Sequence, residues 1–322
     1  MPLDTIYLVR HGNRNNWEID FDKQEYIPEF PTPTGNGADP TLNSSGVQQS
    51  HELASHISSP NFTPKPFRIY SSPFYRCMQT IQPTVEQLTK KTQSGEIDLD
   101  VGTDLNVRVE NGLGEWFGGI TFEPPAPASA NVLYPHFPTC LAENPESLYK
   151  PFVIPPRHGE TLAQLHDRVA ATLAAIIAQA DADIAAAEAS QPVDSPRTSK
   201  AILISSHAAP LIAMGRALTG RMPTEFEEKD FNVFTAGVST FTRRKPASEG
   251  DHVVLGAVPD WKNGKGVGGG WECVKNGDTA FLSGGAESGW HFEGEASFDT
   301  STTMAKTADG DTGVIATTTV VV

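Results

Sequence analysis

The chain has 322 residues, of which 38% are hydrophobic and 20% charged, a composition typical of a soluble protein with material for one large domain or two small ones. Its formal net charge of −15 argues against general affinity for nucleic acid or anionic membranes, although a few converging cations could still bind an anion locally. No apolar run approaches the roughly 20 residues that a membrane-spanning helix needs, so we expect no membrane association.

The first predicted element is a buried strand at residues 6–9, which ends at Arg10, His11 and Gly12. Residues 15–40 carry several prolines without a clear period, and we expect a long loop over one face of the domain. Residues 41–46 are rich in helix-capping side chains and predict a helix that ends near residue 57.

A second strand is predicted at residues 67–70, followed by a helix at 74–90 and a third strand at 97–101. Strands that alternate with helices are typical of a parallel sheet covered on both faces. The predicted fold class is therefore α/β, with a mostly parallel sheet flanked by helices on both faces.

The second half begins with a loop-rich stretch, residues 102–160. The longest helix is predicted at 162–189, where alanine is abundant. The segment 201–206, which opens with four apolar residues, is the clearest buried strand in the chain, and a helix from 210 to 218 should end at Gly220.

The pattern changes after Gly237, where helical periodicity is lost. Short β-type runs lie between glycines at residues 238–242, 252–258, 271–274, 279–282 and 290–293. We expect a catalytic domain at 1–245 and a β-rich C-terminal extension at 246–300, part of which could add to the sheet edge. Residues 301–322 are rich in Thr and poor in aromatics, and a flexible tail is expected there.

The candidate chemistry begins at the end of the first strand. Gly12 would let the chain turn and bring bare backbone to a ligand beside Arg10 and His11. Open α/β sheets bind ligands at the carboxyl ends of their strands. A lone R-H-G tripeptide is more often a strand end with solvated charges, so its interpretation depends on the rest of the chain.

Two further segments place chemistry at the ends of strands. Arg76 lies in the first turn of a helix directly after a strand, where free N–H groups favour an anion and an arginine can bind phosphate with two donors. A solvated arginine is an equal alternative. His207 ends the strand at 201–206, and it could be a structural histidine as readily as a site residue.

Two acids complete the set of candidates. Glu115 lies in a glycine-framed loop beside Trp116, where burial could raise the pKa of the carboxyl as a general acid requires, although an ordinary loop acid is the commoner case. Glu160 opens the long helix, where capping is the simpler role. A second R-H-G tripeptide precedes it at 157–159, but it does not follow a strand and we treat it as a chance repeat.

Together these groups suit phosphoryl transfer. A neutral imidazole can be the nucleophile and form a phosphohistidine, while arginines stabilise the negative oxygens and Glu115 exchanges protons with the leaving group and water. The three cysteines, Cys77, Cys140 and Cys273, lack disulfide or zinc spacing. We therefore expect no metal and no cofactor, and a reducing intracellular compartment, cytoplasmic or nuclear.

Taken in chain order, the R-H-G, S-S-P-F-Y-R-C-M-Q-T, G-L-G-E-W and S-S-H-A segments resemble the histidine phosphatase superfamily, also called phosphoglycerate mutase-like. The resemblance covers about residues 5–245. It implies that His11 is the phosphorylated nucleophile, that Glu115 is the proton donor, and that Arg10, Arg76 and His207 bind the phosphoryl group. It also implies substrate-binding roles for Gly12, Arg14 and Glu160.

Within the superfamily, the R-H-G-x-R pattern resembles eukaryotic tyrosine-phosphatase-like suppressors of T-cell signalling and the phosphatase-like domain of a fungal RNA polymerase III transcription-factor subunit. Residues 39–46 support this placement. Mutases proper lack the long excursion at 15–40, which makes mutase activity unexpected.

Two functions follow. The first is a metal-independent phosphomonoesterase that acts on a phosphorylated small molecule or phosphoprotein. The second is a binding or assembly protein that keeps a phosphate pocket for docking and contacts a protein partner through its C-terminal extension. No mapped catalytic position is substituted, which favours the enzyme.

Overall fold

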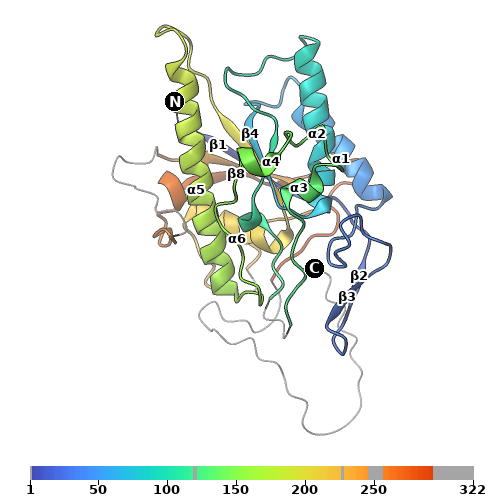
Figure 1. The fold of residues 1–322 in the computed structure, drawn as a ribbon. Helices are drawn as coiled ribbons and strands as arrows, with labels where there is room; N and C mark the ends of the chain where they lie inside the picture. Colours follow the sequence, from blue (N-terminus) through green and yellow to red (C-terminus); the bar gives the residue numbers. More distant parts are fainter. Residues whose placement is uncertain (1, 119–121, 226–227, 246–256, 293–322) are drawn as a thin grey trace.

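The apolar run at the N-terminus forms β1 (Thr5–Arg10), which lies inside a six-stranded sheet in a computed structural model that describes residues 2–118, 122–225, 228–245 and 257–292 (Figure 1). The strand order is β5-β4-β6-β1-β7-β8. Its other strands are β4 (Pro66–Ser71), β5 (Val107–Val109), β6 (Ala201–Ser206), β7 (Val238–Arg243) and β8 (Trp271–Asp278).

Four neighbouring strands run parallel, because β1 and β4 both pair with β6 in parallel and β5 pairs with β4 in parallel. The pairing of β1 with β6 runs from Thr5 opposite Ala201 to Arg10 opposite Ser206. β7 then pairs with β1 antiparallel, and β8 with β7 antiparallel. The predicted α/β class with a mostly parallel sheet is confirmed.

Helices cover both faces of this sheet (Figure 1). One face is covered by α1 (Ser44–Ile57) and α2 (Tyr75–Gln93), and the other by α5 (Leu162–Ala189) and α6 (Ala208–Thr219). The remaining short helical elements are η1 (Asn111–Leu113), α3 (Ala130–Leu133), α4 (Pro145–Leu148) and η2 (Val267–Gly269).

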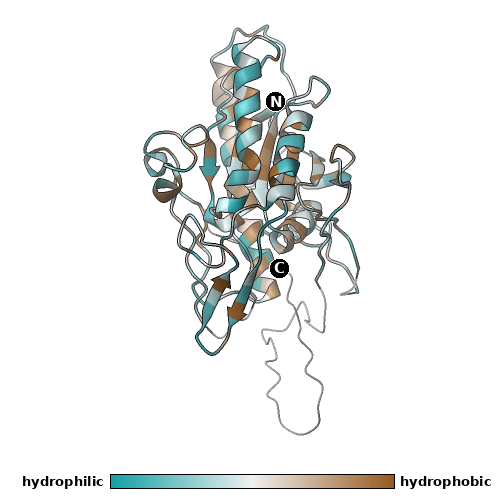
Figure 2. Cartoon of the chain, turned by 90° about the vertical axis from the view of Figure 1, so that its right-hand side faces the viewer, coloured by the Kyte–Doolittle hydropathy of each residue, from teal (hydrophilic) through white to brown (hydrophobic). Residues whose placement is uncertain are grey.

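Alternation along β1 explains why two cores form. Ile6 and Leu8 pack with α5 and α6, whereas Tyr7 and Val9 pack with α1 and α2. Successive side chains of a strand point to opposite faces, so a strand that is buried on both sides must be apolar throughout. In Figure 2 the helices that face the viewer carry many hydrophilic residues, and the strand between them is hydrophobic.

The helix boundaries follow local capping chemistry. Asn43 caps α1 by accepting a hydrogen bond from the Gly46 N–H at 2.9 Å. Thr161 and Gln164 form a reciprocal capping box at the start of α5. Gly220 ends α6 with φ 76°, in the left-handed region, as predicted.

By length and composition α5 could cross a membrane, but 61% of its most apolar window is buried inside the protein. Leu165, Val169, Leu173 and Ile176 on this helix are all part of the core shared with the sheet and α6. This burial accounts for the apolar composition of the helix.

Three predicted features differ from the structure. The excursion at 15–40 contains a hairpin, β2 (Trp17–Asp20) and β3 (Glu25–Pro28), and is not wholly a loop. Residues 97–101 form no strand; Ile97 is buried without joining the sheet, and Asp100 pairs with Lys200 at 3.0 Å. The strand next to β4 is instead β5, inside the stretch predicted as loops.

The C-terminal expectations were partly right. Strands form at 238–242 and 271–274 within β7 and β8, and β8 is the edge strand of the sheet. Residues 279–282 and 290–292 are not strands. Most of the run at 252–258, residue 293 and the tail lie outside the described residues.

Candidate active site

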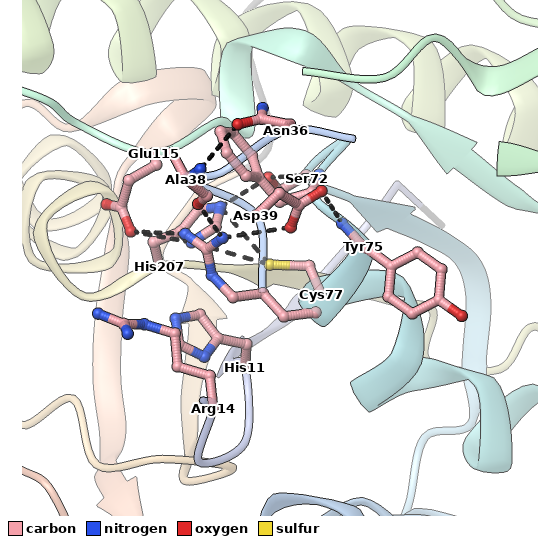
Figure 3. Close-up of polar contacts among 12 residues, drawn as sticks. His11, Arg14, Asn36, Ala38, Asp39, Ser72, Tyr75, Cys77, Glu115 and His207 are labelled. Atoms are coloured by element: carbon pink, nitrogen blue, oxygen red, sulfur yellow. Dashed lines mark hydrogen bonds and ion pairs between the residues drawn. The ribbon is translucent and has the colours of Figure 1, made fainter. Parts of the chain in front are cut away.

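The ends of three parallel strands bring the predicted site residues together (Figure 3). His11 follows β1, Ser72 follows β4 and His207 follows β6. Backbone hydrogen bonds join these ends, because the His11 N–H donates to the Ser206 carbonyl at 3.0 Å and the Ser72 N–H donates to the Ser205 carbonyl at 2.9 Å. The crevice at the carboxyl end of the sheet is therefore where the candidate chemistry lies.

The ring of His11 is held in one tautomer. Its Nδ1 lies 2.8 Å from the carbonyl oxygen of Gly12, which can only accept, so the proton is on Nδ1 and Nε2 keeps a lone pair. Burial, and then the positive charge of Arg76, holds the pKa of His11 well below 6.5. The imidazole is therefore neutral at pH 7, as a nucleophile must be.

Arg76 is fully buried in the first turn of α2. Its Nη2 lies 3.1 Å from Glu115 Oε2 and 3.1 Å from His207 Nδ1. Its Nη1 donates to the Ala38 carbonyl at 3.0 Å and to Asp39 Oδ1 at 3.3 Å. A guanidinium held on both sides presents a fixed charge to the crevice.

Asp39 is a site residue that sequence reasoning did not identify. It is fully buried, and its Oδ2 accepts from the Tyr75 N–H at 2.8 Å, a bond that Figure 3 shows. Asp39 therefore caps the first turn of α2 and orients Arg76 at the same time. Asp39 belongs to the segment 39–46 that supports the family placement, but no pattern in the neighbouring sequence predicts its contact with Arg76.

His207 and Glu115 form a buried pair, with His207 Nδ1 3.1 Å from Glu115 Oε2. Ser72, which was not predicted as a site residue, contacts the other ring nitrogen of His207 at 2.7 Å. Burial lowers the pKa of His207 to about 4, so this ring is also neutral at pH 7.

The expectation that the pKa of Glu115 is raised was wrong. Burial does act in that direction, but the charges of His207 and Arg76 and the hydrogen bonds to the carboxylate outweigh it and lower the pKa. Because His207 is neutral at pH 7, we attribute the lowering at that pH to Arg76 and to the Trp116 N–H, which donates to Oε1 at 3.0 Å. Glu115 is therefore ionised until a phosphoryl group competes for Arg76.

Arg10 precedes His11 in the chain, and one nitrogen of its guanidinium is hydrogen-bonded to the backbone. Its Nη1 donates to the backbone carbonyls of Val233, at 2.8 Å, and Ser288. Burial lowers its pKa to about 10, so it stays charged at pH 7. The Nε atoms of Arg10 and Arg76 are buried without a hydrogen-bond partner in the part of the chain that the structure describes, which leaves both as donors for an anion.

Arg14 lies against the hairpin. Its guanidinium carbon is 3.6 Å from the centre of the Trp17 ring, and Nη1 donates to the Asn15 carbonyl at 3.0 Å. Burial lowers its pKa to about 9. The Trp17 ring is also 5.3 Å from the Arg76 guanidinium carbon, so it lies next to two of the cations.

Gly12 acts through close packing. A Cβ atom there would lie 2.8 Å from the Gly46 carbonyl oxygen, and one at Gly46 would lie 1.9 Å from the Asn13 carbonyl oxygen. The loop after β1 thus rests directly on the start of α1, and the Gly12 N–H donates to Thr80 on α2 at 2.9 Å. The structure supports a positioning role; contact of Gly12 with substrate stays a prediction.

Glu160 forms a bidentate ion pair with Arg168 of α5, with Nε–oxygen distances of 2.7 and 2.9 Å. Nη1 of Arg168 donates to the carbonyls of Gly112 and Gly114, so the pair supports the loop that carries Glu115. Contact of Glu160 with substrate stays a prediction. In the second R-H-G tripeptide, Arg157 and His158 are exposed.

Could this site hold a metal? Ligand atoms of His11, Glu115 and His207 all lie within 4.8 Å of one another, close enough to share an ion. However, Arg76 Nη2 already contacts the same carboxylate oxygen and the same His207 nitrogen, and a cation there would repel a metal ion. The donor set suits a phosphoryl group better.

The order of these motifs matches a known family. A sequence model of the histidine phosphatase superfamily (branch 1) matches residues 6–250. The chain belongs to this superfamily. It is also a distant homologue of the 55 kDa subunit of transcription factor tau from Saccharomyces cerevisiae (strain ATCC 204508 / S288c), with 28% identity over 307 residues. The match covers 91% of this chain and 59% of that subunit, so the chain spans little more than half of its relative.

A solved phosphatase structure shows the same fold. The ecdysone phosphate phosphatase of Bombix mori, in complex with tungstate, is similar with a TM-score of 0.50 and 17% identity, over 74% of this chain and 88% of that one. The phosphoserine phosphatase of Entamoeba histolytica, in complex with 3-phosphoglyceric acid, has a TM-score of 0.43 and 17% identity, over 86% and 98%. The similarity to the ecdysone phosphate phosphatase confirms the phosphoglycerate mutase-like fold predicted for the chain.

Proposed function

We propose that the chain is a metal-independent phosphomonoesterase that acts through a phosphohistidine on His11. The observation that carries this proposal is the fixed tautomer of a buried, neutral His11, because it supplies an unprotonated Nε2 beside the unpaired Nε donors of two arginines. Membership of a superfamily of phosphatases and mutases supports it.

In the first step, Nε2 of His11 attacks phosphorus and the bond from phosphorus to the ester oxygen breaks. Arg10 and Arg76 bind the phosphoryl oxygens, and His207 with Ser72 completes the cradle. A substrate that enters as the monoanion can pass its proton to Glu115. The phosphoryl group then competes with the Glu115 carboxyl for the Arg76 guanidinium. Glu115 delivers that proton to the leaving oxygen.

In the second step, the Glu115 carboxylate accepts a proton from water as the water oxygen attacks phosphorus. The bond from phosphorus to Nε2 breaks and its electron pair returns to His11. Glu115 then passes the proton to the departing phosphate, which restores the carboxylate as inorganic phosphate leaves. Cys77, although 3.6 Å from His207 Nε2, is not an alternative nucleophile, because burial raises the pKa of its thiol to about 12.

The test is hydrolysis of p-nitrophenyl phosphate in EDTA from pH about 5 to 8, a range that brackets the ordinary histidine pKa of about 6.5. We expect turnover by the wild type in chelator, and a loss of at least about a thousandfold in His11→Ala, because the nucleophile is removed. Activity should not fall steeply on acidification through pH about 6.5, because the pKa of His11 lies well below that value.

The matched control is His158→Ala, which changes the exposed histidine of the second R-H-G tripeptide and should keep wild-type activity. Turnover that persists in His11→Ala, or that disappears from the wild type in EDTA, would reject the proposal.

The second candidate is a docking protein with little or no turnover. The similarity to a transcription-factor subunit favours it. A folded wild type that binds orthovanadate but hydrolyses none of a panel of aryl, sugar and seryl phosphates would favour this second function.

A further inference from the structure

Residues 281–292, here termed the C-terminal strap, run past the candidate active site after the last strand of the sheet. At one end Phe281 stacks on His56 of α1, with ring centres 4.2 Å apart. At the other end the Phe292 ring lies 5.6 Å from that of Trp116, the residue after Glu115. The strap therefore runs from the C-terminal end of α1 to the loop that carries Glu115.

The middle of the strap contacts the loop after β1. Glu287 Oε2 accepts from Asn13 Nδ2 at 2.7 Å and from Gln49 Nε2 at 3.0 Å. Ser288 Oγ donates to Asn13 Oδ1 at 2.9 Å, and the Ser288 carbonyl accepts from Arg10 Nη1. Both side-chain ends of Asn13, two residues from His11, are thus bound to the strap.

The charges are arranged so that the arginines stay available. The carboxylate of Glu287 accepts hydrogen bonds from the neutral amides of Asn13 and Gln49. Arg10, in turn, donates to backbone carbonyls, which carry no net charge. An arginine oriented in this way keeps its positive charge for a ligand. Ser288 has φ 49°, a left-handed conformation that a residue other than glycine keeps only where its surroundings hold it.

We propose that the strap is a wall of the phosphate site, in which Ser288 and Glu287 are positioning residues. Ser288 holds Arg10 in the orientation that binds a phosphoryl group, and Glu287, through Asn13, fixes the loop after β1 that carries His11. This inference rests on the proposed function for its substrate, a phosphomonoester. It extends the site to a segment that lies beyond residue 250, where the family match ends.

The test uses the full chain with Glu287→Ala and Glu287→Gln, and with Glu272→Ala on the exposed side of β8 as the matched control. KM and kcat for p-nitrophenyl phosphate are measured together with orthovanadate affinity by calorimetry. In Glu287→Ala we expect KM and the vanadate Kd to rise about tenfold and kcat to change by less than about threefold. Glu287→Gln should stay within about twofold of the wild type, since its amide oxygen still accepts hydrogen bonds.

Unchanged affinity in Glu287→Ala would overturn the proposal, as would higher activity, which would mean that the strap blocks the site. Equal weakening in the Ala and Gln variants would also overturn it, because the hydrogen bonds would then not be the cause. A wild type that binds orthovanadate without hydrolysing any ester would reject the proposed function alone, and the vanadate affinities would still decide the role of the strap.

A second measurement needs no variant. If the strap strengthens anion binding, anion binding must strengthen the docking of the strap, because the coupling is reciprocal. Hydrogen exchange in peptides that cover 281–292 should slow when orthovanadate is added to the wild type. Unchanged or faster exchange would contradict the proposal.

Discussion

At the scale of single residues, the site places neutral imidazoles next to charged guanidinium groups. His11 and His207 are both neutral at pH 7 because burial lowers the pKa of each, whereas Arg10 stays charged. In the proposed reaction Glu115 is the residue that changes its protonation state, and it lies in contact with Arg76 and His207. A bound phosphoryl group would share Arg76 and so free the carboxyl to take up a proton.

The prediction at this scale is that Glu115→Gln impairs catalysis according to the leaving group. General acid catalysis is worth about 10² to 10⁴ in rate, and p-nitrophenolate needs little of it because it is stable without a proton. We therefore expect a loss of about a hundredfold or more for an alkyl phosphate such as phosphoserine and a much smaller loss for p-nitrophenyl phosphate, measured as kcat/KM.

Glu123→Gln, at an exposed position in the same region of the chain, is the control and should match the wild type. An equal loss for both substrates would show that Glu115 supports the loop or binds phosphate and does not protonate the leaving group.

At the scale of elements, the β2–β3 hairpin adds an aromatic row beside the site. Phe74 contacts His207 with ring centres 4.9 Å apart, Phe117 lies 6.1 Å from Phe74, and Tyr26 lies 5.7 Å from Phe117. Trp17, 6.4 Å from Tyr26, covers Arg14. The hairpin thus places aromatic rings next to two of the cations, as a wall for an aryl group would require.

If the chain is the proposed phosphatase, we expect kcat/KM to be higher for a phosphotyrosine peptide than for glucose 6-phosphate. Trp17→Ala should reduce that ratio about tenfold, because stacking on the ring is lost. Phe30→Ala, which changes an aromatic residue of the same excursion that is 54% exposed, is the control.

A wild type that prefers the sugar phosphate would count against an aryl pocket. If Trp17→Ala lowers thermal stability and leaves the ratio unchanged, the ring only packs the hairpin onto the domain.

At the scale of the whole molecule, burial of neutral histidines makes stability depend on pH. Burial lowers the pKa of His166 on α5 and of His207 to about 4 each. Between pH about 6.5 and 4 the unfolded chain binds protons at these positions that the folded chain does not, so stability falls as pH falls through this range. The shift corresponds to roughly 3 kcal/mol for each histidine at the acid end.

We therefore expect the urea midpoint to decline from pH about 7 to 4, and His166→Gln to make that decline shallower, because one of the buried histidines no longer titrates. His51→Gln, at an exposed position of α1, is the control and should follow the wild type. A wild-type midpoint that does not change with pH, or a slope that His166→Gln leaves unaltered, would show that these histidines do not govern acid stability.

Much of the fold and site was predictable because the information is local. A continuous apolar run such as 201–204 indicates a strand that is buried on both sides, and the polar residues that follow it lie at the strand end. This located His207 and, in the same way, His11. Caps such as Gly220 need only their own turn. The run at 97–101 alternates apolar and acidic residues, a pattern typical of a half-buried strand, yet it forms no strand, and β5 takes the place beside β4.

By itself the sequence determined the α/β class, the helix and strand that carry each motif, and the residue types at the site. Only the tertiary structure decided the hairpin within 15–40, the contact of Asp39 with Arg76, the lowered pKa of Glu115 and the docking of Glu287 and Ser288 on the loop after β1. The physical reason is distance along the chain: Glu287 is 274 positions from Asn13, and the sign of a pKa shift depends on which charges folding brings within a few ångströms.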